Sequence, residues 1–313
     1  MAKSATAGTA HVPQGSRGMP WSPIFRELGD PEKRTAYYMV MPALLLILII
    51  AFTPIVYSFV LSFQETIPGQ SSTWVGFDNY VNMFQDPDFL TGLTNTAVFT
   101  VASVSFEFSL GLWLATALNR GFRGQGTMRS IALMPWAFPT VISAVMWRLM
   151  YQDGVGIMAY IAETIGLYTK PILTSEGALM VAAILVDVWK TTPFMAILLL
   201  AGLQTIPEDV YEAARVDGAT PKQSFWRITF PLLKGSILVA LLFRTLDAWR
   251  IYDLFWAMSD RQLDSLSTYV FTGVRISQLD FSLGMAASVF IFLSSLAIAF
   301  IFIGALGVRA NKA

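Results

Sequence analysis

The chain has 313 residues, of which 55% are hydrophobic and 13% are charged, and its mean hydropathy is +0.56. Average soluble domains carry about 25% charged residues, so this composition excludes an ordinary water-soluble enzyme and indicates a membrane protein. The 21 basic side chains are balanced by 21 acidic ones, which argues against binding of nucleic acid. There is no Cys, and His11 is the single His, so the sequence predicts neither a disulfide nor a metal site.

Six apolar stretches are long enough to cross a bilayer as helices, because about 20 residues span a hydrocarbon core of roughly 30 Å. Runs such as ALLLILIIAF lack the alternation of a barrel strand, so we expect an all-α membrane protein with six transmembrane helices. The first stretch begins after nearly forty polar residues, so we expect it to be retained and not cleaved as a signal peptide. The predicted spans are 39–63, 95–118, 130–151, 178–203, 235–258 and 282–307.

The basic residues predict the orientation, because cytoplasmic segments of membrane proteins are enriched in Lys and Arg. With both termini in the cytoplasm, fourteen of the 21 cations fall in inner segments and three in outer loops, while four lie within spans. The inner set is Lys3, Arg17, Arg26, Lys33, Arg34, Arg120, Arg123, Arg129, Arg215, Lys222, Arg227, Lys234, Arg309 and Lys312; the outer set is Lys170, Arg261 and Arg275; and the set within spans is Arg148, Lys190, Arg244 and Arg250.

This topology divides the chain into five regions. We expect a cytoplasmic N-terminal segment (1–36), a first transmembrane helix (37–64), an outer loop (65–92), a core of five further transmembrane helices (93–307) and a cytoplasmic tail (308–313). In the outer loop, WVGFDNYVNMF fits either a short helix on the membrane surface or a plain loop. A cytoplasmic loop interrupts the core at 204–234.

This inner loop carries signals for two short helices. Thr205 with Glu208 and Thr220 with Gln223 both have the spacing of a capping box. Gly218 lies between the two pairs, where a left-handed residue would end the first helix. The loop is therefore expected to fold as helix, sharp turn and helix, with an apolar stripe of Ile206, Val210, Ala213 and Ala214 that either packs on its own helix ends or receives a partner.

The stretch EAARVDGATPKQSFWRITFPLL resembles the EAA signature of permease subunits of ATP-binding-cassette importers. Upstream, DVWKTTPFMAILLLAGLQTIPEDVYEAA resembles the carbohydrate-uptake branch, which includes maltose, trehalose and glycerol-phosphate permeases, and LLFRTLDAWRIYDLFW looks closest to trehalose or maltose permeases of actinobacterial type. One departure is Gly235, where many relatives have proline. Matching signature positions are Glu212, Ala213, Ala214, Asp217, Gly218, Ala219, Phe225, Ile228, Pro231 and Leu232, of which the first six are the candidate ATPase-coupling residues.

The resemblance implies a type I importer permease in the cytoplasmic membrane of a prokaryote, and not an enzyme. Its loop would dock as a coupling helix on one of two cytoplasmic ATPase subunits, which would bind the ATP and Mg²⁺, so this chain itself carries no cofactor. In agreement, the sequence has no phosphate-binding GxxxxGK[ST] run, and GFRGQGT lacks the Lys. The other implied partners are a second homologous permease, an extracytoplasmic sugar-binding protein, which is a lipoprotein in some systems, the sugar and membrane lipid.

Five ionisable residues fall near the predicted midplane, at about 14 to 18 Å from the start of their spans. They are Glu107, Asp187, Lys190, Arg244 and Asp247. Charges at this depth are costly, so we expect them to face the bundle interior. The spacing suggests a pair between Asp187 and Lys190 and a ladder of alternating sign along Arg244, Asp247, Arg250 and Asp253.

These charges allow two interpretations. They form a structural ion-pair ladder, or they belong to a sugar site together with aromatic side chains that contact the apolar face of a pyranose. A Trp belt at the lipid interface is the alternative role for the aromatic residues. The helix break expected at Pro193 fits either a kink or a binding site. The substrate-binding candidates are Glu107, Trp136, Asp187, Trp189, Lys190, Thr191, Arg244, Asp247, Trp249 and Arg250.

The leading functional prediction is a permease subunit of an ATP-driven sugar importer, with trehalose or maltose as the expected substrate and glycerol-phosphate as the alternative. A secondary transporter driven by protons or Na⁺ through the midplane carboxylates is the second hypothesis, but it predicts internal repeats, which the sequence lacks. A channel or passive scaffold is the third. Neither of the last two explains the capped inner helix pair.

Overall fold

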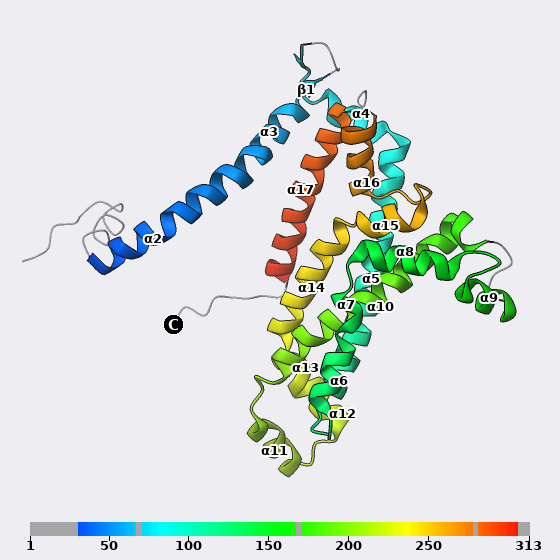
Figure 1. Cartoon of the computed structure of the whole chain (residues 1–313). Helices are drawn as coiled ribbons and strands as arrows, with labels where there is room; N and C mark the ends of the chain where they lie inside the picture. The colour runs from blue at the N-terminus through cyan, green and yellow to red at the C-terminus, as the bar shows by residue number, and fades with distance from the viewer. Residues whose placement is uncertain (1–30, 67–70, 167–170, 278–280, 306–313) are drawn as a thin grey trace, which may run out of the picture. The chain divides into compact units, whose positions relative to one another are not determined.

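The computed structural model describes residues 31–66, 71–166, 171–277 and 281–305, which are mostly helical (Figure 1). The chain divides into two compact units, Met1–Tyr57 and Ser58–Ala313. The predicted N-terminal segment as far as residue 30, Lys170 and the C-terminal tail lie outside the described residues.

The first predicted span is one continuous helix over Thr35–Ser62, most of which lies in the first unit. It consists of α2 (Pro31–Ile47), the π-helical turn η1 (Leu48–Phe52) and α3 (Thr53–Ser62). Pro54 follows the π-helical turn by two residues, and Pro231 has the same position after a second π-helical turn described below. Proline cannot donate to the carbonyl one turn earlier, so a widened turn before it is a local consequence of the sequence.

One end of the second unit is formed by a short antiparallel ribbon and a helix. Strands β1 (Gln64–Glu65) and β2 (Thr73–Trp74) pair Gln64 with Trp74, and α4 spans Asp78–Gln85. The buried Asn79 side chain donates to the carbonyl oxygens of Ser62 and Gln64 at 2.9 and 3.0 Å, which fixes α4 against the end of α3. The segment WVGFDNYVNMF therefore contains a helix.

The centre of the second unit is a pair of long helices, α5 (Pro87–Asn119) and α10 (Glu176–Leu203), which pack along their lengths. Gly111 allows this close approach, because a Cβ there would lie 2.7 Å from Cγ of Met195. Helices α14 (Lys234–Trp249) and α17 (Phe281–Ala305) pack beside them (Figure 1). Pro193 lies inside α10, which runs as one helix, so of the two alternatives the interrupted helix does not occur and the kink stays a prediction.

The remaining elements are short. They are α6 (Gln125–Ala132), α7 (Met134–Ala137), α8 (Thr140–Tyr151), α9 (Ile157–Thr164), η2 (Ile172–Thr174), α11 (Glu208–Val216), α12 (Pro221–Ser224), the π-helical η3 (Phe225–Thr229), α13 (Phe230–Leu232), α15 (Asp253–Ser259), α16 (Leu266–Phe271) and the π-helical η4 (Thr272–Ile276).

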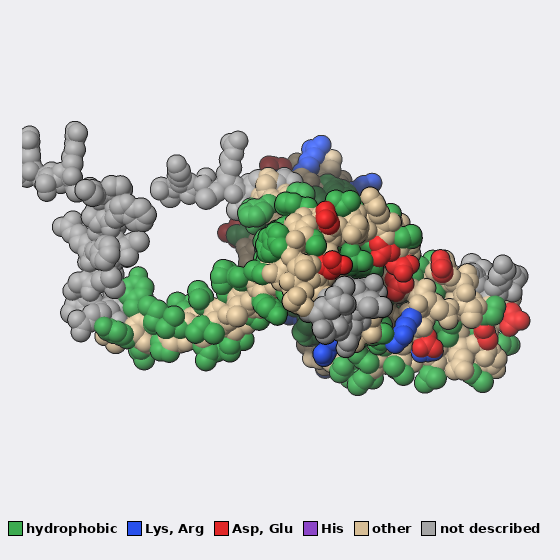
Figure 2. Space-filling view, turned by 90° about the horizontal axis from the view of Figure 1, so that it is seen from above, with side chains coloured by type: hydrophobic (Ala, Val, Ile, Leu, Met, Phe, Trp, Pro, Cys, Tyr) green, Lys and Arg blue, Asp and Glu red, His purple; other side chains and the backbone are tan. Residues whose placement is uncertain are grey.

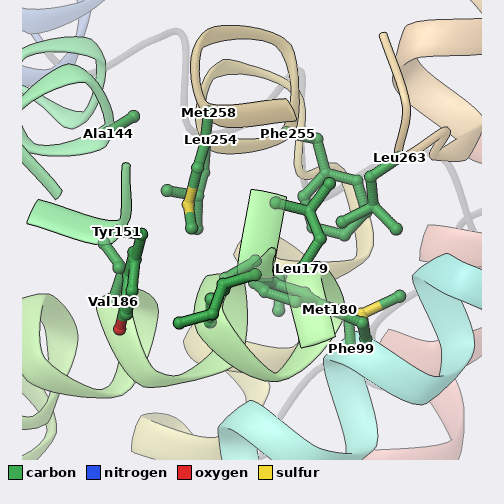
Figure 3. Packing of buried hydrophobic residues seen from close by; sticks show 14 of the residues in the cluster. Phe99, Ala144, Tyr151, Leu179, Met180, Val186, Leu254, Phe255, Met258 and Leu263 are labelled. Carbon is green, nitrogen blue, oxygen red and sulfur yellow. The ribbon is translucent and has the colours of Figure 1, made fainter. Parts of the chain in front are cut away.

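A hydrophobic core joins α5, α8, α10 and α15. Figure 3 shows Phe99 and Phe255 close to one another, and their rings meet edge to face with centroids 5.0 Å apart. Met258 and Leu254 lie between Ala144 of α8 and Leu179 of α10 in the same view. This packing fixes α15, and the turn that follows it, against the N-terminal half of α10.

The count of six spans stays a prediction. The described residues contain four helices long and apolar enough to cross a membrane, or five if the pair Pro221–Leu232 and Lys234–Trp249, bent by 66°, is one span. The third predicted span is divided among α6, α7 and α8, because Pro135 and Pro139 each start a new helix. The helix of the fifth predicted span, α14, ends at Trp249, nine residues before the predicted end at residue 258.

The second unit has an acidic end. Seen along its length, the face that carries α4 and α16 shows several Asp and Glu side chains and fewer Lys and Arg side chains (Figure 2). This is the end that the distribution of cations places outside the cytoplasm.

Candidate functional site

The buried Arg244 connects three helices through carboxylates. Its Nε donates to Oε2 of Glu107 at 2.5 Å, and its Nη2 donates to Oε1 of Glu107 at 2.8 Å and to Oδ2 of Asp187 at 2.9 Å. Its Nη1 donates to Oδ2 of Asp247, three residues further along α14, at 2.5 Å. Because Glu107 is on α5 and Asp187 is on α10, one guanidinium links α5, α10 and α14. These four side chains are called the Arg244 cluster below.

Burial differs sharply within the Arg244 cluster. Glu107 and Arg244 are 0% and 2% exposed and Asp187 is 5% exposed, whereas the side chain of Asp247 is 72% exposed. The expectation that midplane charges face the interior is therefore confirmed for the first three residues, and for Asp247, whose side chain is exposed on this single chain, it stays a prediction. The exposed carboxylate is the polar atom of the cluster that a ligand can reach.

The pairing within the Arg244 cluster differs from the sequence prediction. Asp187 pairs with Arg244 and not with Lys190, because α5 and α14 bring Glu107 and Arg244 to the same side of α10 as Asp187. In the predicted ladder only the step from Arg244 to Asp247 forms among the described residues, since the Arg250 Nε donates to the carbonyl oxygen of Leu246.

Lys190 is half-buried and makes no hydrogen bond or ion pair with the residues that the structure describes. It nevertheless lies within electrostatic reach of Asp187, Asp247 and Asp253. Together with the Arg244 cluster it gives three carboxylates against two cations. The ammonium group of Lys190 keeps free N–H donors.

Hydroxyl groups extend the cluster along α5. Thr191 Oγ1 lies 2.6 Å from both Oε1 of Glu107 and the carbonyl oxygen of Asp187. Thr96, Thr100 and Ser103 are buried on the same face of α5 as Glu107, at helical spacing. The hydroxyls of Thr100 and Ser103 have no partner within the described ranges. These three hydroxyl residues were not among the candidates predicted from the sequence. Their spacing of three or four residues, which places them on the helix face of Glu107, was a signal that could have identified them.

The aromatic candidates are distributed over several contacts. Trp136 stacks on Phe194 with centroids 5.4 Å apart, and Trp189 meets Trp147 edge to face at 5.4 Å. Trp249 donates its indole N–H to the Ser294 hydroxyl at 2.8 Å, so its polar atom is directed to α17. The structure does not bring these Trp residues together as one platform.

The inner loop forms the predicted helix, turn and helix. Gly218 has φ +76°, its N–H donates to the carbonyl of Arg215, and the N–H of Ala219 donates to the carbonyl of Ala214. These are the two hydrogen bonds of a Schellman motif, which left-handed glycine makes possible. Thr220 and Gln223 form the predicted capping box of α12. Thr205 does not cap α11, because its hydroxyl donates to the carbonyl of Gly202.

The surface of α11 combines charged and apolar groups. Glu212 is exposed and forms an ion pair of 3.8 Å with Arg215, Ala213 is exposed, and Ala214 is buried against the chain itself. Asp217 is also exposed. Val216 is 88% exposed just before the turn, an apolar side chain that sequence reasoning did not include. An apolar tip with flanking charges is a surface suited to a protein partner.

Comparisons with known proteins extend over most of the chain. The trehalose/maltose transport system permease protein MalF of Thermococcus litoralis is 36% identical over 277 residues, which cover 87% of this chain and 93% of the relative. The trehalose transport system permease protein SugA of Mycobacterium tuberculosis is 36% identical over 297 residues, covering 92% and 94%. Such identity over nearly whole chains shows common membership in one family.

The fold agrees with this relationship. A chain of a bacterial ABC transporter involved in the import of alginate superposes with a TM-score of 0.77 at 24% identity, covering 93% of this chain and 99% of the other. The similarity shows that the two chains share a fold, and the relatives above are permease proteins, so this chain is a transport component and not an enzyme. Residues 107–312 match the model of the binding-protein-dependent transport system inner membrane component, and the chain belongs to that family.

Proposed function

We propose that this chain is one permease subunit of an ATP-driven importer for a neutral disaccharide, with trehalose or maltose as the substrate. The observation that carries the proposal is the identity to trehalose and maltose permeases over about nine-tenths of the chain. The Arg244 cluster is the proposed polar part of the sugar site. Asp247 and Lys190 supply an acceptor and a donor for hydroxyl groups, while Glu107 and Asp187 hold Arg244 in place.

The charges favour a sugar over glycerol-phosphate. A phosphate needs free guanidinium or ammonium groups, but every guanidinium nitrogen of Arg244 already donates to a carboxylate. The remaining cation, Lys190, is surrounded by Asp187, Asp247 and Asp253. A neutral ligand avoids the repulsion that these carboxylates would impose on a phosphate.

Energy is proposed to enter through α11. ATP binding would bring together two ATPase subunits on the cytoplasmic side, and the exposed tip with Glu212, Val216 and the Gly218 turn would transmit their movement to the membrane helices. The segment Pro221–Leu232 follows the Gly218 turn directly. It joins α14, the helix that carries Arg244, at a bend of 66°. A movement of α11 would therefore reach the Arg244 cluster through a short rigid path.

The remaining assembly follows from the same proposal. A second, homologous permease would complete the pathway in the cytoplasmic membrane of a prokaryote, and an extracytoplasmic sugar-binding protein would deliver the substrate. ATP and Mg²⁺ would bind to the ATPase subunits. The two permeases would alternate between states open to either side, with nucleotide shifting the balance.

The test is uptake by proteoliposomes that contain the chain with its co-encoded subunits. Labelled trehalose and maltose are expected to accumulate only with ATP, to persist when an ionophore collapses the proton gradient, and to resist competition by glycerol 3-phosphate. Loss of uptake with the gradient while ATP is present would support a secondary transporter instead. The variant Glu212→Lys should abolish coupling, whereas the control Glu163→Lys, at an exposed position of α9, should not.

A further inference from the structure

The turn after α15 has an unusual backbone. Asp260 and Arg261 have φ values of +51° and +69°, and within the described ranges they are the two non-glycine residues with positive φ. Asp adopts positive φ more readily than most residues, but Arg does not. Contacts with neighbouring residues must therefore stabilise this turn. One restraint is the ion pair between Asp260 and Arg148 of α8, with N–O distance 3.2 Å.

The strained turn places the Arg261 guanidinium over Trp256. The Arg261 Cζ atom is 5.0 Å from the centroid of the Trp256 ring. Tyr252 stacks on the same indole with centroids 5.8 Å apart and an interplanar angle of 21°, and Phe271 approaches it at 4.8 Å and 67°. Arg261 therefore covers one face of the Trp256 ring. The cover is an exposed, flexible side chain and not a packed core residue.

The aromatic group follows α14, the helix that carries Arg244, in the chain. Tyr252 and Trp256 follow α14 directly, at the end of that helix remote from α11 (Figure 1). Asp253 lies between them in sequence, is exposed, and is within electrostatic reach of Lys190. A ligand on Trp256 would therefore have the exposed carboxylate of Asp253 three residues away on the same helix, α15.

We propose that the Trp256 face now covered by Arg261 is a contact site for a pyranose ring, occupied when Arg261 moves aside. This inference rests on the proposed function and adds a sugar site at the outer end of α14. Pyranosides present C–H groups on one face, which pack well on an indole, and hydroxyls at their rim for the Asp253 carboxylate. The sugar replaces a cation–π contact, so Arg261 exchanges one partner on Trp256 for another.

The alternative environment for a half-buried Trp in a membrane protein is the lipid interface. The cation over the ring and the exposed carboxylate of Asp253, three residues earlier in α15, argue for a hydroxyl-rich ligand over acyl chains. The lipid alternative is treated as an outcome of the test.

The first experiment measures the transport KM in proteoliposomes of the whole complex. Trp256→Leu should raise the KM for trehalose or maltose at least tenfold with less than a threefold loss of maximal rate, whereas Trp256→Phe, which keeps an aromatic face, should stay within threefold. Arg261→Gly relieves the backbone strain and uncovers the ring, so the KM should fall or stay unchanged. The control Trp113→Leu removes a 69% exposed Trp from α5 and should leave transport unchanged.

A second measurement avoids variants that fail to assemble. In the wild-type complex, saturating sugar should protect Trp256 from oxidation by N-bromosuccinimide, detected by mass spectrometry of the peptide, and Trp113 should gain no protection. A KM within twofold of wild type for Trp256→Leu, or protection that depends on lipid and not on sugar, would overturn the inference. If the wild-type complex takes up neither sugar with ATP, the proposed function itself fails.

Discussion

Arg244 binds Glu107 through two parallel hydrogen bonds of 2.5 and 2.8 Å, although 137 residues separate the two side chains in the sequence. The geometry is the bidentate fork of a guanidinium on a carboxylate. It closes α14 onto α5 at a depth where neither charge reaches solvent. Removal of one partner therefore leaves the other buried without compensation.

The first prediction is an order of stability among single neutralisations. Arg244→Gln strands Glu107 and Asp187 together and should cost about 3–5 kcal/mol. Glu107→Gln should cost less, since Arg244 keeps Asp187 and Asp247, and Asp247→Asn should cost under about 1 kcal/mol because its carboxylate is exposed. Thermal denaturation of the purified complex in detergent measures the order, and equal losses for all three variants would show that the cluster does not hold the helices.

The second prediction concerns the turn at Gly218. A Cβ at this position would meet no atom within 4 Å, so the cost of substitution is backbone strain alone. Gly218→Val should destabilise the turn by about 1–2 kcal/mol and reduce sugar-stimulated ATPase activity, while Gly218→Asn should be tolerated because Asn adopts positive φ. Equal activity of the Val and Asn variants would contradict the role of this conformation in coupling.

A third prediction separates substrate contact from structural pairing. Lys190 has no ion pair or hydrogen bond among the described residues, so Lys190→Gln should leave the melting temperature of the complex within about 2 °C of wild type. If its ammonium donates to sugar hydroxyls, the transport KM should rise about tenfold, the equivalent of one charge-assisted hydrogen bond. An unchanged KM for trehalose and maltose would remove Lys190 from the site.

The fourth prediction compares two neighbouring glycines. A Cβ at Gly202 would collide with the Ser236 side chain and approach Cδ1 of Leu233 to 2.8 Å, whereas a Cβ at Gly235 would meet nothing within 4 Å. Gly202→Ala should separate α10 from α14 and cost about 1–3 kcal/mol. Gly235→Ala should be neutral or stabilising, because Gly235 is in helix α14 and alanine is a better helix former than glycine. Melting temperatures of both variants in the same detergent decide the comparison.

A fifth prediction uses the half-buried Asp264, in the loop before α16. Burial raises the pKa of this carboxyl, and Asp88 and Glu176 raise it further, while the hydrogen bond from Thr268 opposes them. The folded state therefore binds the proton more tightly than the unfolded state, so this contribution to stability is present at low pH and lost as pH rises. Asp264→Asn should raise the melting temperature at pH 8 relative to wild type and lose that advantage near pH 4.

The sequence alone was sufficient for elements whose cause is local. Gly218, Thr220 and Gln223 specify the turn and capping box of the inner loop through interactions within a few residues, and both were predicted correctly. The long apolar runs also predicted α5, α10 and α17, since a run of that length has few alternatives to a helix. The EAA-type stretch pointed to the importer family, which the comparisons establish.

Tertiary structure decided the pairing of charges and the path of the chain between the long helices. Asp187 has Lys190 three residues away, yet it bonds with Arg244, 57 residues distant, because packing of α10 against α14 supplies a partner that spacing within one helix cannot reveal. The position of Arg261 over Trp256 likewise depends on a strained turn held by Arg148 of α8. Local periodicity fixes which face of a helix a residue occupies, but only the packing of helices determines which group that face meets.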